Sequence, residues 1–456
     1  MQLDWKKIDR FLFGEAWTNS QIGERAQVLC EDIGPRWASS ASERRAAEYI
    51  RDQFKTDGLE EAALEEFELA TWGYDSAEAV LVDEKLSIDL LPFNRCPPCA
   101  LEAPIVDVGY GTAREVEATP DLAGAIAVMR IAYEPFSTPT PLAQRLEALA
   151  AAGAAAAVCI DPKDGRRVEY HNAGDWRMYE KAEAPFPCVT TSREHGALLS
   201  KKVGQLLSIE VVSRSYDAPT QNTVAHLTGA RWPQQQLVLG GHHDTVFSAP
   251  GGNDNGSGTL AVMETARILA TLKKECGIEP GCTLRFSTFS AEEQRLAGAA
   301  EYARRHCGPE QQTRLVINLD ELSTGHIKGI VLAFPHLRAV VQEQLDHMGD
   351  GLQCHVMAQL DSTSDHFPFL RQGVDAAHMW RWRFYGRHAD ANYHHEAADT
   401  LDKLNVRELK EYAGQLARLL LRLSHIEPED WPQNLQTVDS VRERIDAERG
   451  TVVRVF

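Results

Sequence analysis

The chain has 456 residues, of which 43% are hydrophobic and 25% are charged, and its formal net charge is −19. This length allows two or three domains, and the composition is typical of a soluble globular protein. The excess of negative charge makes nucleic acid and anionic membranes poor candidates for partners. The N-terminal residues show no signal-peptide pattern, and no window reaches the apolar length of a membrane span, so we expect a cytoplasmic protein.

Nine cysteines are scattered along the sequence, and their odd number favours free thiols in a reducing compartment. The pair Cys96-Pro-Pro-Cys99 has the spacing of a metal or redox motif. Because no second pair accompanies it, we expect a simple turn at this position.

The first 70 residues have mainly helical patterns. One helix is expected at 40–59, where an apolar stripe ends at Gly58. From residue 65 to residue 91 the pattern changes to the alternation that is typical of strands. The chain therefore passes from helices to an extended region before any candidate site residue appears.

A segment rich in proline and polar residues, 92–104, marks a domain boundary. Beyond it, residues 105–215 are expected to form a smaller inserted α/β module. Residues 1–104 and 216–456 would then form one discontinuous domain. Inside the insert we expect a strand, a helix and a second strand, at 125–130, 141–152 and 154–160.

From Asn222 onward, short apolar runs alternate with helical segments, as in α/β proteins with a mostly parallel central sheet flanked by helices. The expected strands are 223–228, 236–241, 283–289, 314–320, 329–334 and 374–380. The expected helices are 257–273, 292–306, 336–348, 364–372 and 404–424. Such a sheet places its chemistry at the carboxyl ends of the strands.

Histidines and carboxylates lie at these strand ends and at one helix start. Imidazole and carboxylate groups together suit Zn²⁺ or a similar divalent ion. Several carboxylates favour two ions, since one carboxylate can bridge a pair about 3.5–4 Å apart. The candidate residues are His242, Asp244, Asp254, Glu292, Glu293, Asp320 and His395.

Each of these residues alone has a simpler explanation. A single histidine is more often a core or surface residue than a ligand. The run Asn253-Asp-Asn-Gly256 is typical of a turn before a helix. The pair Glu292-Glu293 is favoured by the dipole of a following helix, and Asp320 is compatible with a solvated loop. Their order and placement together favour a metal site.

In this order the motifs resemble the co-catalytic di-zinc aminopeptidase family. That family includes secreted leucyl aminopeptidases, plasma glutamate carboxypeptidase and the more distant glutaminyl cyclases and transferrin receptor. The resemblance covers about residues 222–405. Its motifs are GGHHDT, GGNDNGSG, FSAEEQRLAG, NLDE, SDHFPFLRQGV and HHEAADTLDKL.

The resemblance implies two Zn²⁺ ions per chain and a role for each motif residue. His242 and Asp320 would bind one ion, and Glu293 and His395 the other, with Asp254 bridging. Asp244 would orient the His242 ring, and Glu292 would be the general base and then the acid. Only one of the adjacent His394 and His395 should be a ligand. The family's spacing to the Asp399-Thr400 pair selects His395, with His394 as the alternative.

The insert resembles a protease-associated domain through LAGAIAVMRIAY and AAGAAAAVCI. Other candidates for substrate contact are less specific. Asp365 and His366 lie in the SDH motif, and an aromatic, basic stretch precedes His395. That stretch is equally compatible with a buried strand and a charged loop. Its candidate residues are Trp382, Arg383, Tyr385 and Arg387.

The resemblance implies a metal-dependent exopeptidase acting on a peptide or a small amino-acid-derived substrate. We expect an aminopeptidase, the commonest activity of the family. The alternatives are a carboxypeptidase or dipeptidase of the same fold, a glutaminyl cyclase with one zinc ion, and a non-catalytic receptor-like binding protein. The oligomeric state stays open, a homodimer being one option.

Overall fold

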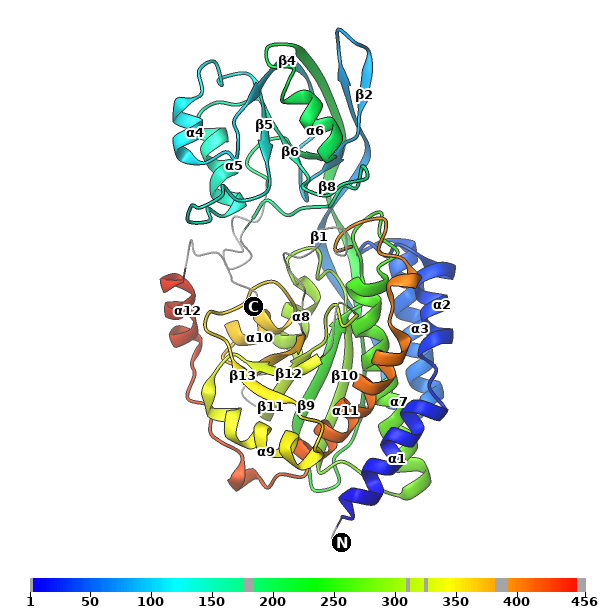
Figure 1. Cartoon of the computed structure of the whole chain (residues 1–456). Coiled ribbons are helices and arrows are strands. Elements are labelled where there is room, and N and C mark those ends of the chain that lie inside the picture. Colours follow the sequence, from blue (N-terminus) through cyan, green and yellow to red (C-terminus); the bar gives the residue numbers. More distant parts are fainter. Residues whose placement is uncertain (1–2, 175–183, 309–311, 324–326, 382–392, 449–456) are drawn as a thin grey trace.

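The computed structural model describes residues 3–174, 184–308, 312–323, 327–381 and 393–448, arranged as two lobes (Figure 1). The lower lobe in this view contains most of the helices and the central sheet. The upper lobe is smaller and has its own strands and helices. Within the described ranges, no helix is long and apolar enough to cross a membrane.

The lower lobe is organised around a mixed sheet in the order β13-β12-β14-β11-β9-β10-β8. Neighbouring strands are parallel in four pairs, β10 with β9, β9 with β11, β11 with β14 and β12 with β13. This arrangement confirms the predicted α/β class with a mostly parallel sheet. The strands are β9 (Trp232–His242), β10 (Cys282–Phe289), β11 (Gln312–Asn318), β12 (Ile327–Leu332), β13 (Gln353–Val356) and β14 (Ala376–Arg381).

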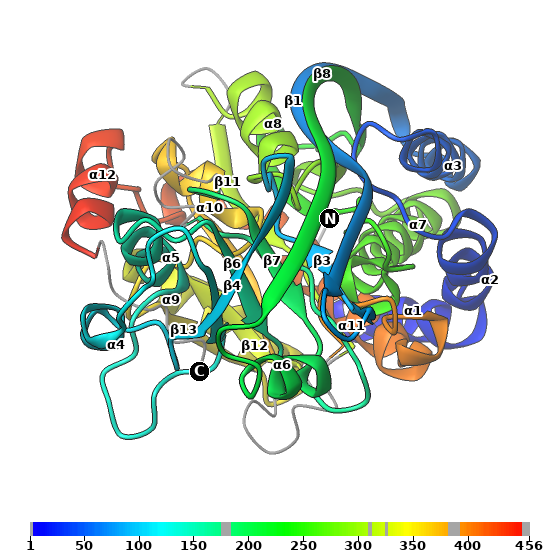
Figure 2. The ribbon, with the colours of Figure 1, turned by 90° about the horizontal axis from the view of Figure 1, so that it is seen from above.

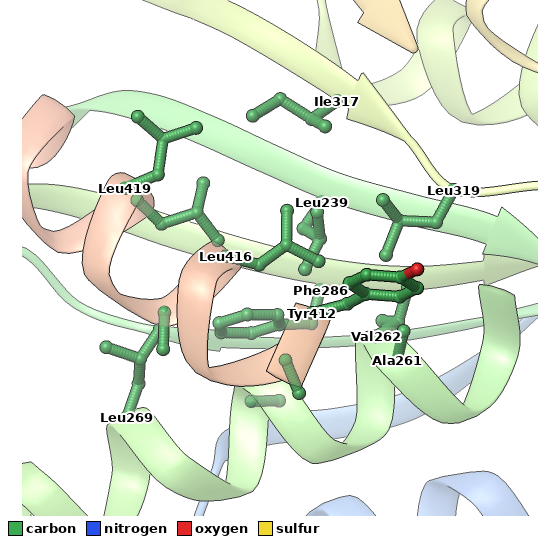
Figure 3. Packing of buried hydrophobic residues seen from close by; sticks show 14 of the residues in the cluster. Leu239, Ala261, Val262, Leu269, Phe286, Ile317, Leu319, Tyr412, Leu416 and Leu419 are labelled. Atoms are coloured by element: carbon green, nitrogen blue, oxygen red, sulfur yellow. The ribbon is translucent and has the colours of Figure 1, made fainter. Parts of the chain in front are cut away.

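Helices cover both faces of this sheet, which explains why its central strands are apolar without alternation. Along β9, Leu237 and Leu239 belong to one buried cluster, whereas Val238 belongs to a cluster on the opposite face. On the first face Leu239 packs near residues of two long helices, Val262 and Leu416 (Figure 3). The helices of this face are α1 (Trp5–Thr18), α2 (Ile22–Gln27), α3 (Ala41–Asp57), α7 (Gly258–Cys276), α9 (Arg338–Met348) and α11 (Val406–Ser424).

The second face of the sheet carries shorter helices. Phe289 of β10 packs there against Tyr302 and Phe369, with ring centroids 5.5 and 5.9 Å away. Val441 and Ile445 close the same cluster near the C-terminus. The helices of this face are α8 (Ala297–His306), α10 (His366–Arg371) and α12 (Val438–Ala447).

Two strands of 22 residues each, β1 (Glu60–Leu81) and β8 (Leu206–Leu227), connect the lobes. They pair antiparallel, from Glu60 opposite His226 to Leu81 opposite Leu207, and lie side by side in both views (Figures 1 and 2). Only pieces of them were predicted from the sequence. The middle of β8 is mostly exposed, and in the middle of β1 the buried Leu69, Thr71 and Trp72 alternate with exposed and half-buried residues, so neither strand has a long apolar run there.

The upper lobe continues from these strands as a sheet in the order β8-β4-β5-β6-β7-β3. Buried apolar side chains on both sides of β5 and β6 form its core. The insert expected at 105–215 stays a proposal, and elements that begin before residue 105 also belong to this lobe. Its elements are β2 (Leu86–Ile88), β3 (Leu91–Pro92), β4 (Cys99–Asp107), α4 (Ala113–Ala118), β5 (Ile126–Arg130), α5 (Leu142–Ala151), β6 (Ala156–Ile160), β7 (Cys188–Thr191) and α6 (Arg193–Leu199).

One predicted helix begins later than expected, with a consequence for the site. The helix predicted from residue 292 begins at Ala297. Before it, Ala291, Arg295 and Leu296 have φ of 57°, 73° and 59°. These left-handed conformations cannot continue a right-handed helix, so the preceding residues form turns instead. Glu292 and Glu293 therefore lie in a loop and not on a helix.

Candidate metal centre

The five predicted metal ligands meet at the carboxyl edge of the central sheet. His242 is the last residue of β9, Glu293 follows β10 and Asp320 follows β11. His395 lies beyond β14, and Asp254 lies in the turn η3 (Gly252–Ser257) that leads into α7. Because these strands are parallel neighbours, their carboxyl ends bring the following loops together.

Asp254 lies between the two histidines. Its Oδ1 is 3.3 Å from Nε2 of His242, and its Oδ2 is 3.4 Å from Nε2 of His395. Each histidine also faces a second carboxylate: Nε2 of His242 is 3.6 Å from Oδ1 of Asp320, and Nε2 of His395 is 3.0 Å from Oε2 of Glu293. The site is therefore two histidine–carboxylate pairs joined by one aspartate.

The hydrogen bonding of these groups indicates space for a ligand. Within the described part of the chain, Nε2 of His242 and both carboxylate oxygens of Glu293 are buried without a hydrogen-bond partner. Such groups are costly inside a protein, and coordination to a bound ion would satisfy them. Imidazole and carboxylate together form a good donor set for Zn²⁺. The residues present therefore fit a divalent metal ion.

The charges around His242 point the same way. Burial by itself disfavours the charged imidazole, but the neighbouring carboxylates, Glu292 first among them, raise the pKa of His242 well above its ordinary value. Burial also raises the pKa of Glu292 well above its ordinary value, and Glu293, Asp365 and Asp320 add to that rise against the opposite effect of His242. Negative charge is in excess here, and a cation would relieve it.

Hydrogen bonds from outside the centre hold the ligands in place. The Asp399 carboxylate accepts from the backbone N–H groups of Asn253 and Asp254, both at 2.8 Å. Oδ2 of Asp320 accepts from the Ser364 hydroxyl at 2.7 Å. Such contacts fix the orientation of a metal ligand.

Asp244 supports the centre in two directions. Its carboxylate accepts from the backbone N–H groups of Glu292 and Glu293, at 3.1 and 3.3 Å. The same carboxylate lies 3.5 Å from Nδ1 of His242, and the Asp244 backbone carbonyl is nearer, at 3.1 Å. Asp244 thus holds the glutamate pair as well as facing His242, a role that no sequence pattern indicated.

Glu292 lies beside the centre, and its side chain points toward it. It is 4% exposed, and its Oε2 lies 3.9 Å from Nε2 of His242. The turn before α8 and the Asp244 contact together set this position. A carboxyl group with a raised pKa at this place is suited to accept and return a proton.

The adjacent His394 and His395 both reach Asp254. Their rings are stacked with centroids 3.7 Å apart. Nδ1 of His394 lies 3.0 Å from Oδ2 of Asp254 and 3.4 Å from Oε1 of Glu321. Only His395 faces Glu293 in the contacts that the structure describes. His395 and Glu321 have φ of 56° and 48°, and such left-handed conformations in larger residues tend to gather at functional sites.

The predicted substrate-contact residues divide into two groups. Asp365 and His366 are described and buried, with 0% and 1% of their surface exposed. Asp365 interacts electrostatically with residues of the centre. Burial raises its pKa well above the ordinary value, and the charges of Asp244, Asp320 and Glu293 raise it further, whereas His242 opposes the rise. The other four candidates, Trp382, Arg383, Tyr385 and Arg387, lie outside the described residues.

The upper lobe reaches the centre through residues 161–172, which no motif of the sequence indicated. The Tyr170 carbonyl accepts a hydrogen bond from Nδ1 of His395 at 3.0 Å, and the Tyr170 N–H donates to the His395 carbonyl at 3.0 Å. Next to this pair, Glu396 contacts Lys163 and lies 2.6 Å from Nε of Arg167. These contacts attach the upper lobe to the loop that carries His395.

Two other neighbours of the centre were also missed, Glu321 and the supporting role of Asp399. Glu321 is 3% exposed, and its Oε1 accepts from the Asn253 amide at 3.2 Å. Both residues lie inside motifs quoted above, Glu321 in NLDE and Asp399 in HHEAADTLDKL, and this membership was the signal that could have found them.

The mostly parallel sheet and the two-histidine, three-carboxylate centre at its edge define an α/β protein with a candidate metal centre. Residues 222–420 match the model described as Peptidase family M28. These residues include the whole of the centre described above. This part of the chain therefore matches that family, and the rest of the chain lies outside the matched residues.

Curated relatives match over most of the chain. Carboxypeptidase Q from Bos taurus is 24% identical over 420 residues, which cover 89% of this chain and 85% of that protein. Aminopeptidase YwaD from Bacillus subtilis is 25% identical over 401 residues, covering 85% of this chain and 81% of that protein. The relatives therefore include both a carboxypeptidase and an aminopeptidase by name.

Solved structures share the fold. The structure of BSAP, a zinc aminopeptidase from Bacillus subtilis, has a TM-score of 0.72 at 20% identity and covers 91% of this chain and 98% of that one. The peptidase M28 precursor from Shewanella amazonensis has a TM-score of 0.76 at 18% identity, covering 95% and 99%. At these identities the likeness shows the fold alone.

Proposed function

We propose that this protein is a zinc-dependent exopeptidase that removes residues from the free amino terminus of peptides. The observation that supports it best is the position of Asp254, whose two oxygens face two different histidines. One carboxylate placed in this way can bridge two metal ions. The similarity to a zinc aminopeptidase of the same fold also supports the proposal.

The two ions would have matching ligand sets. His242 and Asp320 would hold one ion, His395 and Glu293 would hold the other, and Asp254 would belong to both. The distances between the facing donor atoms, 3.0–3.6 Å, fit this proposal. Donors about 2.0–2.2 Å from one tetrahedral ion are roughly 3.3–3.6 Å apart.

Zinc ions bound at this centre would lower the pKa of a water molecule and polarise the scissile carbonyl. The protein's own side chains would do the remaining work. Glu292 would take a proton from the attacking water and return it to the leaving amine, and its position beside the centre supports this role. Asp244 would keep Glu292 in place through the Glu292 backbone N–H.

The same fold could instead serve a carboxypeptidase or dipeptidase, and one observation favours this second candidate. The relatives named Carboxypeptidase Q match 74–89% of this chain. The centre itself is compatible with either activity, because the same two ions would act on the scissile peptide bond whether the substrate is held by its amino or its carboxyl terminus. Recognition of the substrate terminus must therefore come from other residues.

A panel of matched substrates tests the proposal. Zinc-loaded protein is offered aminoacyl-naphthylamides with a free amine, the same compounds with an acetylated amine, and dipeptides with a free or amidated carboxyl group. We expect cleavage of the free-amine compounds, loss of cleavage after acetylation, and tolerance of amidation. Cleavage that requires a free carboxyl group would favour the carboxypeptidase instead, and no hydrolysis of any compound would contradict both.

A further inference from the structure

A second group of metal-ligating side chains lies outside the centre described above. Asp361 belongs to the loop before α10, His366 is the first residue of α10, and His378 belongs to β14. One donor atom of each lies within 4.8 Å of the others. We propose that Asp361, His366 and His378 together bind one divalent transition-metal ion, with zinc the best match, in addition to the ions around Asp254.

His366 provides the first argument. It is 1% exposed, and neither of its ring nitrogens has a hydrogen-bond partner among the residues that the structure covers. A buried imidazole normally uses at least one nitrogen, so this one calls for a partner. Burial lowers the pKa of His366 although Asp361 and Asp320 oppose that effect.

The other two side chains are oriented for the same purpose. Oδ1 of Asp361 accepts from the Thr363 N–H at 2.9 Å and from the Thr363 hydroxyl at 2.7 Å, which leaves its second oxygen for the proposed ion. Nδ1 of His378 lies 3.3 Å from the Met379 carbonyl, and the proposal assigns Nε2 to the ion. The His366 and His378 ring centroids are 5.0 Å apart.

The dimensions fit a zinc ion after small side-chain movements. Two donors on one ion, each about 2.0–2.2 Å from it, lie at most about 4.2–4.4 Å apart. The donor atoms here lie within 4.8 Å of one another, so binding of the ion would have to draw them slightly closer. Two imidazoles and one carboxylate are a known zinc donor set, and they leave a fourth position for water.

The position of the cluster indicates what the ion would do. Asp361 and His366 enclose Ser364, whose hydroxyl donates to Asp320 at 2.7 Å. An ion that joins both ends of residues 361–366 to β14 would hold this segment, and with it Ser364, against the sheet. The ion would therefore help to orient Asp320 without touching the substrate.

Metal counting tests the proposal. The protein is stripped with a chelator, reloaded with zinc, freed of excess by gel filtration and analysed by plasma mass spectrometry. We expect His366→Gln and Asp361→Asn each to bind one equivalent fewer than the parent protein. His336→Gln is the matched control, because His336 is a half-buried histidine whose Nε2 pairs with Asp375 at 2.9 Å. The control should keep the parent's count.

A second background separates this site from the centre around Asp254. In Asp254→Asn protein, which should lose zinc from that centre, one equivalent should remain, and the added His366→Gln should remove it. This difference is expected whether or not the proposed peptidase activity is found. If circular dichroism shows that His366→Gln does not fold, the metal count of Asp361→Asn tests the proposal instead. Asp361 is only half-buried, so its substitution should disturb folding less. Equal metal counts in the parent and the folded variants would overturn the proposal in favour of a hydrogen-bonded cluster.

Discussion

The two lobes contribute to one site in different ways. The lower lobe places its ligands on short connections after parallel strands, so the sheet determines where His242, Glu293 and Asp320 lie. The upper lobe supplies no ligand in the described residues, but Tyr170 holds the ring of His395 through a backbone carbonyl. The sheet therefore positions the chemistry, whereas the upper lobe sets how firmly one ligand is held.

The largest expected effect belongs to the lower lobe. Asp254→Asn removes the negative charge that both histidine–carboxylate pairs share, so we expect zinc to be lost from the centre. Activity should fall by more than about 10⁴-fold, the upper end of what a general base contributes. Steady-state hydrolysis and metal analysis measure the two effects. Asp164→Asn, at an exposed aspartate of the upper lobe, is the matched control and should keep both zinc and activity.

Glu292→Gln should separate catalysis from metal binding. The amide cannot accept the proton, so kcat should fall by about 10²–10⁴-fold while the centre keeps its zinc. The neighbouring Glu293→Gln should instead lose zinc, because Glu293 faces His395 at 3.0 Å. Stopped-flow or steady-state kinetics with parallel metal counts test the pair. A near-normal rate for Glu292→Gln would refute its role as the base.

The contribution of the upper lobe is tested at Glu396. Glu396→Gln weakens its ion pairs with Lys163 and Arg167, whose side chains are 4% and 17% exposed. Loss of one partner leaves the buried Lys163 charge less compensated, which is destabilising. The loop carrying His395 should then be held less firmly, and zinc affinity should fall by about 10–100-fold, the usual cost of removing support for a metal ligand.

Competition with a chromogenic chelator measures that affinity, and the pH profile of kcat should keep its shape because Glu292 is untouched. Zinc affinity equal to that of the parent protein would mean that the upper lobe covers the centre without supporting it.

The smallest effect is expected at the exposed pair of Arg193 and Asp164 in the same lobe. Their side chains are 55% and 66% exposed. Arg193→Gln should change the free energy of unfolding by less than about 1 kcal/mol, as is usual for surface ion pairs. Zinc affinity should not change. Denaturant unfolding measures the first quantity, and a loss of zinc binding here would show that any weakening of the upper lobe reaches the centre.

Much of the lower lobe could be predicted from the sequence, because its strands and the site residues that follow them are recognisable from short stretches of neighbouring residues. Buried parallel strands such as β9 are short apolar runs, and a polar group such as His242 directly after one lies at the sheet edge. The helix expected from residue 292 was wrong at its start. The left-handed turn at Ala291 and at Arg295-Leu296 depends on packing around the site and leaves no pattern in the sequence.

The upper lobe's share of the site could not be predicted. Lys163 and Glu396 are 233 residues apart, and no local signal joins them. Tyr170 contacts the His395 ring through its backbone carbonyl, so the identity of its side chain does not indicate this contact. The choice of His395 over His394 was different, because the spacing to Asp399-Thr400 selected His395, and His395 is the ring that faces Glu293 in the structure.

The central claim is that Asp254 joins two metal ions, and zinc-edge anomalous diffraction from crystals grown with zinc tests it most directly. We expect two peaks beside Asp254, one between His242 and Asp320 and one between His395 and Glu293. A single peak at the Asp254 carboxylate, or none, would contradict the claim.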